Sequence, residues 1–296
     1  MPAFWHWFVV SLTVIFIIWC IWLIGWSAKQ GPKDVADDDV VGHKWDGDLE
    51  EWNNPAPKWW LYLYFITIAW GIGFLIAYPG LGNFKGMLGW SSAGQYEAEM
   101  QYAAETYDPI YAEFAAMDFA ALTQNDDALS LGKSLFASYC TTCHGSDARG
   151  APGYPNLTDS DWQWGNSEQA IVSTILNGRM AVMTPWAQIL GSDEALTNMA
   201  RYGRSLSGLE EADEAVQAMQ QQFTTYCAAC HTPAGTGNQM LGAPNLTDDV
   251  WLYGSSLEIV RETLIKGRNG QMPAHGELLG EDRTKILAAY VASLSQ

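Results

Sequence analysis

Two five-residue segments carry the residues with the clearest chemistry in the chain. Each has two cysteines that are separated by two residues and followed directly by a histidine: Cys140-Thr141-Thr142-Cys143-His144 and Cys227-Ala228-Ala229-Cys230-His231. This spacing is typical of covalent haem attachment. Two thiols one helical turn apart can bond the two vinyl groups of one porphyrin, while the adjacent imidazole reaches the iron. The sequence therefore predicts two haem c groups, one for each pentad.

Two other uses of such cysteines have to be weighed. A redox-active dithiol is expected within a thioredoxin-like βαβ unit, and the sequence around the pentads does not indicate one. A zinc ion needs a fourth ligand and usually a second paired motif in the same small domain. Because each pentad lies within a repeat that also repeats a methionine, the pattern favours haem over both alternatives.

The sixth ligand of each iron is expected to be a methionine downstream of the pentad, since Met/His ligation raises the reduction potential as electron transfer requires. Met183 and Met272 fit, because each stands four residues after the arginine of a Gly-Arg pair. Met180 and His275 are rivals, but neither is repeated, and Met180 is predicted to pack in the core. The spacing leaves open whether each methionine serves its own repeat's haem or the other one.

Four further residues are predicted to support the haems. Pro155 and Pro244 follow their histidines by 11 and 13 residues and are expected to supply a backbone carbonyl that accepts the other ring N–H. Arg179 and Arg268 are candidates for bidentate hydrogen bonds to haem propionates. A solvated surface position is the alternative for both arginines.

The pentads belong to an internal repeat. A shift of 89 positions aligns residues 155–191 with 244–280 without a gap, and 14 of the 37 positions are identical. The pentads align at a shift of 87, so one loop differs in length by two residues. Helix-like spacing without convincing strands predicts two small all-α domains, 129–208 and 209–296. We call these the first repeat and the second repeat.

Two uncharged apolar runs precede the repeats, at about 4–26 and 59–78. Both are long enough to cross a bilayer as helices, and tryptophans cluster near their ends, as at membrane interfaces. A cleaved signal peptide is the alternative for the first run, but it lacks a basic n-region and is too long. Residues 1–78 are therefore predicted to form a multi-pass membrane anchor of two transmembrane helices.

The distribution of lysine predicts the topology of this anchor. The loop 27–58 carries Lys29, Lys33, Lys44 and Lys58, whereas no basic residue precedes the first run, which places the loop in the cytoplasm. Everything from Pro79 onward is then extracytoplasmic. Residues 79–128 are predicted to be a linker, with a helix from about 97 to 122 that breaks or kinks at its proline.

The overall charge limits the classes of partner that the chain is expected to bind. The chain has 33 acidic and 15 basic residues and a formal net charge of −18. This excludes the basic footprint of a nucleic-acid-binding protein and favours a basic protein partner.

The order of these segments, with the Tyr78-Pro79-Gly80-Leu81-Gly82 exit from the second run, resembles the dihaem subunit III of cbb3-type cytochrome c oxidases. The resemblance implies an anchor followed by tandem cytochrome c domains, in a bacterial inner membrane with both haem domains in the periplasm. It implies a non-catalytic subunit that relays electrons from a donor cytochrome c towards the monohaem subunit and the oxygen-reducing catalytic subunit. It also implies one haem on the first pentad with Met183 and one on the second pentad with Met272.

Two other functions remain open from the residues alone. A membrane-tethered dihaem cytochrome could serve a dehydrogenase, or one iron could open to act as a peroxidase. Six-coordinate irons favour electron transfer, because no position is left at which a substrate could react.

Overall fold

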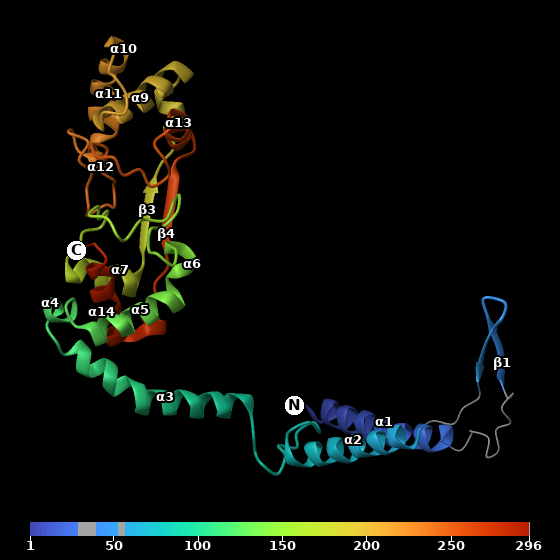
Figure 1. The fold of residues 1–296 in the computed structure, drawn as a ribbon. Coiled ribbons are helices and arrows are strands. Elements are labelled where there is room, and N and C mark those ends of the chain that lie inside the picture. The colour runs from blue at the N-terminus through green and yellow to red at the C-terminus, as the bar shows by residue number, and fades with distance from the viewer. Residues whose placement is uncertain (29–39, 53–56, 296) are drawn as a thin grey trace. The chain divides into compact units, whose positions relative to one another are not determined.

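The computed structural model describes residues 1–28, 40–52 and 57–295. They form two compact units that divide between Ala104 and Glu105. The fold is mostly helical, as predicted, and contains two antiparallel strand pairs that the sequence did not predict (Figure 1). Lys29 and Lys33, used for the topology prediction, lie outside the described residues.

The first unit contains the two apolar helices α1 (Ala3–Ser27) and α2 (Lys58–Ala77). Both are long and apolar enough to cross a membrane, and Ile24 is the only one of their residues that is buried. A helix that is apolar on every face and buries little of it within the protein is typical of a lipid environment. The side chains of Cys20 and Tyr64 lie close enough to interact between the two helices. Between the helices in sequence, β1 (Val40–Trp45) and β2 (Leu49–Trp52) form a hairpin.

The chain turns back at the end of α2. The N–H groups of Met87 and Leu88 donate to the carbonyls of Ile76 and Ala77, at 2.9 and 3.0 Å, which satisfies two carbonyls of the last helical turn. The N–H of Asn83 donates to Nδ1 of His6 at 2.9 Å. The exit segment is therefore tied to the ends of both apolar helices.

The linker helix α3 (Ser92–Ala115) is followed by the single turn α4 (Phe119–Leu122). Of the predicted break or kink at Pro109, the break is wrong, because α3 continues through this proline and ends at Ala115, while a kink there stays a prediction. The break lies where Asp118 caps α4, its side chain accepting the N–H of Ala120 at 2.9 Å. A local side-chain cap, and not the proline, sets this helix boundary.

The two repeats contain the remaining elements. The first repeat has α5 (Asp126–Tyr139), α6 (Thr141–His144), α7 (Glu168–Asn177), β3 (Arg179–Met183), α8 (Ala187–Leu190) and α9 (Asp193–Leu206). The second has α10 (Glu214–Gln217), α11 (Gln220–Tyr226), α12 (Ala228–His231), α13 (Leu257–Lys266), β4 (Arg268–Met272) and α14 (Gly276–Ser293). The hydroxyls of Ser167 and Ser256 cap α7 and α13 equivalently, each accepting an N–H three residues on.

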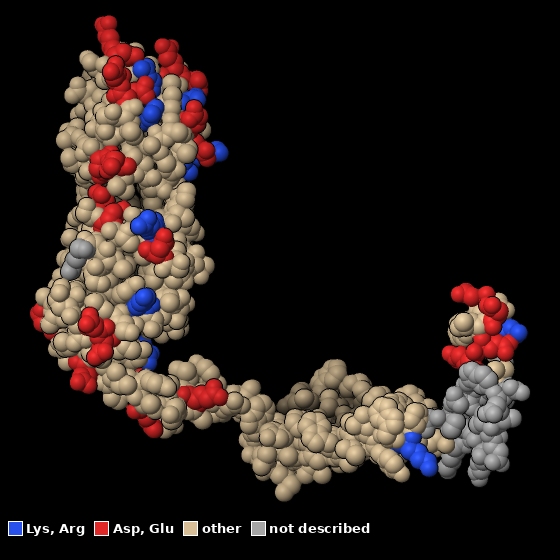
Figure 2. Space-filling view, viewed as in Figure 1, with Lys and Arg blue, Asp and Glu red and all other residues tan. Residues whose placement is uncertain are grey.

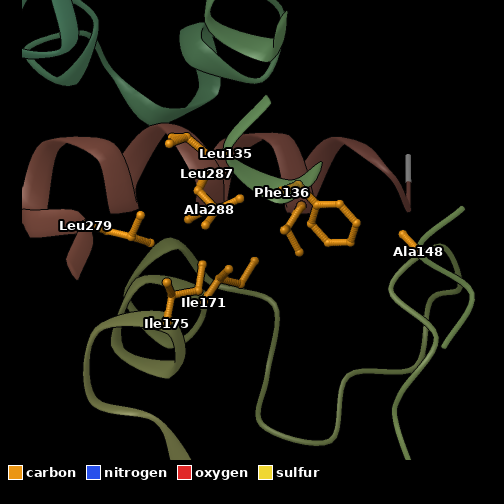
Figure 3. Close-up of a cluster of buried hydrophobic side chains, with 9 residues drawn as sticks. Leu135, Phe136, Ala148, Ile171, Ile175, Leu279, Leu287 and Ala288 are labelled. Carbon is orange, nitrogen blue, oxygen red and sulfur yellow. The ribbon is translucent and has the colours of Figure 1, made fainter. Parts of the chain in front are cut away.

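The last helix of each repeat packs on the other repeat. Helix α14 packs on α5 and α7, and α9 packs on α13 and α10. Figure 3 shows the result for what we call the first core, where side chains of α5, α7 and α14 point toward one another. Its buried members are Leu135, Phe136, Ala148, Ile171, Ile175, Leu279, Leu287, Ala288 and Val291. The second core comprises Leu196, Met199, Ala200, Tyr202, Val216, Met219, Phe223 and Leu264.

Strands β3 and β4 join the two repeats as an antiparallel pair, which we call the crossing ribbon. Arg179 lies opposite Met272, Ala181 opposite Gly270, and Met183 opposite Arg268. In Figure 1 the ribbon runs between α5, α7 and α14 at one end and α9, α11 and α13 at the other. Because a shift of 89 residues exchanges the two strands, a local two-fold axis passes through the pair of Ala181 and Gly270.

Candidate haem-binding sites

Each pentad begins where a helix ends. Cys140 closes α5 and Cys227 closes α11, and the following residues form the short helices α6 and α12. We call Cys140, Cys143 and His144 the first site, and Cys227, Cys230 and His231 the second site.

Both histidines are buried, and each is held through its own Nδ1 atom. Nδ1 of His144 lies 3.2 Å from the carbonyl oxygen of Pro155, and Nδ1 of His231 lies 3.0 Å from that of Pro244. Burial is the main cause that lowers the pKa of both rings. The hydrogen bonds to the proline carbonyls act in the opposite direction and raise the pKa. A neutral imidazole that donates its Nδ1–H to a carbonyl keeps a lone pair on Nε2, which is the arrangement that a metal ligand needs.

The four pentad cysteines are free thiols. Burial raises the pKa of Cys140 and of Cys227 to about 11, and the neighbouring cysteine of each pentad adds to the effect. A redox-active dithiol has a lowered thiol pKa, so this environment argues against that alternative. Among the residues that the structure describes, no group of three or more His, Cys, Asp or Glu side chains could hold a metal ion, which leaves the zinc alternative without support.

The structure brings each candidate methionine to the pentad of the other repeat. Met272 packs against the first core together with Cys140, whereas Met183 packs against the second core together with Cys227. The same-repeat grouping that the resemblance implies therefore differs from the structure. The crossing ribbon is the physical reason, because it carries each strand's last residue into the opposite repeat.

Backbone hydrogen bonds at both ends of the ribbon fix this exchange. The N–H of His275 donates to the carbonyl of Ile175 at 2.9 Å, and the N–H of Trp186 donates to that of Leu264 at 2.8 Å. The ring of His275 lies near enough to His144 to affect its pKa, which places the segment after Met272 at the first site.

Aromatic contacts repeat the same exchange. Tyr290 of α14 packs on Phe136 with ring centroids 5.7 Å apart, and Tyr202 of α9 packs on Phe223 at 5.3 Å. The ring of Trp186 lies 5.9 Å from that of Tyr226, the residue before the second pentad. Helix packing, backbone bonds and ring contacts thus agree that residues 183–206 complete the second site and residues 272–293 the first.

Arg179 and Arg268 are half-buried and equivalently bound. Nε of each donates to a threonine hydroxyl at 2.9 Å, of Thr174 and Thr263 respectively. The guanidinium groups stack at 5.0 Å on the ring of Trp164 and at 4.4 Å on that of Tyr253. Each arginine lies opposite the methionine of the other repeat in the ribbon. A hydrogen bond from either arginine to a haem propionate remains a prediction.

The two alternative candidate ligands, Met180 and His275, do not share the positions of Met183 and Met272. Met180 lies on the outer face of β3 and is 65% exposed, so the prediction that it packs in the core is wrong. The alternation of side chains along a strand explains this, because residues three positions apart point to opposite faces. Nδ1 of His275 lies 2.9 Å from the carbonyl oxygen of Pro273 and is engaged there.

The side chains of both sites fit a haem. Each site combines two unpaired thiols, a buried neutral imidazole with a free Nε2, and a methionine thioether from a separate element, beside an apolar core. Sequence reasoning missed the crossing ribbon and the stacked Trp164 and Tyr253. The repeat alignment contained a signal for the stacked rings, because it equates these two aromatic positions.

Comparison with known proteins agrees with this chemistry. The family described as the N-terminal domain of cytochrome oxidase-cbb3, FixP, matches residues 37–85. The family described as cytochrome c oxidase, cbb3-type, subunit III, matches residues 127–202 and again 214–291. The two matches of the second family coincide with the two repeats and each includes one pentad.

Several relatives are similar to this chain over most of its length. The cbb3-type cytochrome c oxidase subunit CcoP of Rubrivivax gelatinosus is 42% identical over 99% of this chain and 95% of its own length. The subunit FixP of Azorhizobium caulinodans is 37% identical over 90% of this chain and 97% of its own. The subunit CcoP of Cereibacter sphaeroides is 34% identical over 90% and 98%. The chain therefore belongs to the family of subunit III of cbb3-type cytochrome c oxidases, the membrane-anchored electron-transfer subunits that carry covalent haem c.

Proposed function

We propose that the chain holds two haem c groups in crossed sites and relays electrons between them, from a basic donor cytochrome c towards the other subunits of the oxidase. In this proposal Cys140, Cys143, His144 and Met272 hold one haem. Cys227, Cys230, His231 and Met183 hold the other. The observation that carries it is the crossing ribbon, which packs each methionine with the opposite pentad.

The residues around each site suit electron transfer. A bound haem c supplies one-electron chemistry at its iron. The Pro155 and Pro244 carbonyls hold the two imidazoles in one orientation and one tautomer, and the apolar cores exclude water from the ligand side. The methionines are expected to take the position that a peroxidase would need open.

The crossing ribbon also sets the spacing of the two methionines. Met183 and Met272 lie at opposite ends of a five-residue strand pair, roughly 13 Å apart along it at about 3.3 Å per residue. Hydrogen bonds of the ladder hold the two methionines at this separation.

The location follows from the anchor. We propose that α1 and α2 both cross the bacterial inner membrane as a multi-pass anchor and that both haem sites lie in the periplasm. The lysines of loop 27–58 support this topology, as does the chemistry of covalent haem attachment, which takes place outside the cytoplasm in the cytochrome c family. From residue 79 onward 25 acidic residues oppose 11 basic ones, which would steer a basic donor to this side.

Chains with a single haem test the crossed ligation. A Cys140→Ala and Cys143→Ala chain is expected to keep only the haem of the second site. In that chain Met183→Ala should abolish the sulfur–iron charge-transfer band and lower the haem potential by on the order of 0.1 V, because the axial ligand sets much of it. Met272→Ala should leave both unchanged and is the matched control.

The reciprocal chain with Cys227→Ala and Cys230→Ala should respond to Met272→Ala and not to Met183→Ala. A pyridine haemochrome assay should give two haems for the unmodified chain and one for each single-haem chain. Same-repeat responses would refute the crossing while leaving haem binding intact. A colourless chain made with a working maturation system would refute the whole proposal.

A further inference from the structure

The two repeats differ in length at one turn. In the first repeat a backbone bridge joins Ala151 to Tyr154, and in the second the equivalent bridge joins Asn238 to Ala243. The second turn is therefore longer by two residues, which accounts for the change of the repeat shift from 87 to 89. At its tip stand Met240, 88% exposed, and Leu241, 51% exposed. We call residues 239–242 the Met-Leu turn.

The Met-Leu turn is held firmly at its base. The N–H of Gly237, just before the turn, donates to the carbonyl of His231 at 3.0 Å. Nε2 of Gln239 donates to the carbonyl of Trp162 at 2.9 Å, and the side chain of Gln163 donates to the carbonyl of Gly242. The backbone is thus bound to the second site and to the first repeat, while the two apolar side chains at the tip project outward.

Most of the charges in the loops beside the turn are negative. The two loops that meet here, 145–167 and 232–256, contain Asp147, Asp159, Asp161, Asp248 and Asp249 against one basic residue, Arg149. The guanidinium groups of Arg179 and Arg268 also reach these loops, where they stack on Trp164 and Tyr253. Asp161 neighbours Trp162, which binds the turn, and interacts with Asp248 across the two loops. Burial is the main cause that raises the pKa of Asp248, and the like charges of Asp161 and Asp249 raise it further. Acidic side chains also spread over the visible face of this unit (Figure 2).

We infer that the Met-Leu turn and its acidic rim form the docking point for the basic electron-donor protein. The inference rests on the proposed electron-transfer function and assigns a surface to it. An apolar centre surrounded by charge that complements the partner is typical of protein interfaces. A methionine adapts its shape to a surface that binds only briefly, as a donor must. Donor contact at this turn lies close to the second site through the bond between Gly237 and His231.

The test uses the purified oxidase complex and a small, soluble c-type cytochrome of positive net charge as the donor probe. A Met240→Ser and Leu241→Ser double variant should raise the KM for this probe about tenfold, as expected for the loss of interface anchors. Turnover with a small diffusible amine reductant, the haem content and the co-purifying subunits should stay unchanged. Asp161→Asn with Asp248→Asn should flatten the salt dependence of the KM.

Met180→Ser is the matched control, because Met180 is also an exposed methionine but lies on the crossing ribbon. It should leave the KM for the probe unchanged. An unchanged KM in the double variant, or an equal change in the control, would overturn the inference. Loss of other subunits from the double variant would also overturn it, since the turn would then contact the complex. A complex that lacks haem or fails to oxidise the small reductant would instead overturn the proposed function.

Discussion

At the residue after the candidate ligand histidine, the first site has Gly145 and the second has Thr232. Both adopt nearly the same backbone, with φ 78 and ψ 157 at Gly145 and φ 66 and ψ 159 at Thr232. This region of conformational space is essentially restricted to glycine, so the second site stores strain that the first does not. The Thr232 hydroxyl partly offsets it by accepting the N–H of Thr236 at 3.1 Å.

The elements before the two pentads differ as well. Helix α5 is continuous over 14 residues, whereas the equivalent part of the second repeat is broken into α10 and α11. The composition of residues 211–226 alone favours a single helix there. Just before α10, Glu210 links Arg201 and Arg204 of α9, at 2.8 and 2.6 Å.

The comparison separates the features that the two halves share from those in which they differ. The candidate ligand set, the Gly-Arg pairs, the threonines that bind the arginines and the ribbon register are the same in both. Turn length, helix continuity and ion pairs differ. The parts in common either touch a site or carry a strand across to the other repeat.

The largest effect is expected at Gly178. A Cβ there would lie far inside van der Waals contact with the carbonyl oxygen of Met272 and within 2.8 Å of the Ala274 nitrogen, and φ is 70°. Gly178→Ala should lower the free energy of unfolding by about 3 kcal/mol and weaken the methionine signature of the first site only. Gly280 has the same backbone conformation and open space around it, so Gly280→Ala should show the smaller cost of the strain alone. Equal effects of both variants in denaturant unfolding would contradict the crossed contact.

Substitutions that exchange the residue types at Gly145 and Thr232 should change the stability by intermediate amounts and in opposite directions. Gly145→Thr should destabilise by about 2 kcal/mol, since φ is positive and a Cβ would lie 2.9 Å from an Asp147 oxygen. Thr232→Gly should stabilise by about 1 kcal/mol through release of strain. Thr232→Ala keeps the strain and removes the hydroxyl, so it should not stabilise. Thermal unfolding of the haem-loaded protein measures all three, and destabilisation by Thr232→Gly would refute the strain argument.

The smallest effect is expected at Glu210. Its carboxylate is about 20% exposed and binds two arginines, so Glu210→Gln should cost about 1 kcal/mol and reduce the dependence of stability on salt. Glu262→Gln removes an exposed helical ion pair with Lys266 and should change stability by a few tenths at most. Similar losses of stability in both variants would show that the ion pairs of Glu210 with α9 stabilise the protein no more than an exposed helical pair does.

Local patterns made much of this molecule predictable. The pentads, the two apolar helices, the repeat and helix α9 follow from residue type and spacing, which the sequence displays directly. The ribbon does not, because β3 and β4 are five residues each and contain a glycine and few β-branched residues. Their pairing depends on contacts between segments 89 residues apart, and no local period reports those. The exposed Met180 was mispredicted for the same reason, since its orientation depends on a strand that the sequence did not reveal.

The crossing ribbon has a consequence for the order of biosynthesis. Met272 comes 128 residues after His144, whereas Met183 precedes His231 by only 48. The entropic cost of closing the longer connection is greater by about 0.9 kcal/mol. A nascent chain that has emerged only as far as α9 has its first pentad but neither Met272 nor α14, so that pentad must wait for the C-terminus to arrive. In the proposed crossed arrangement, a chain that stops before Met272 would therefore lack the methionine of the first site and could not work as an independent half.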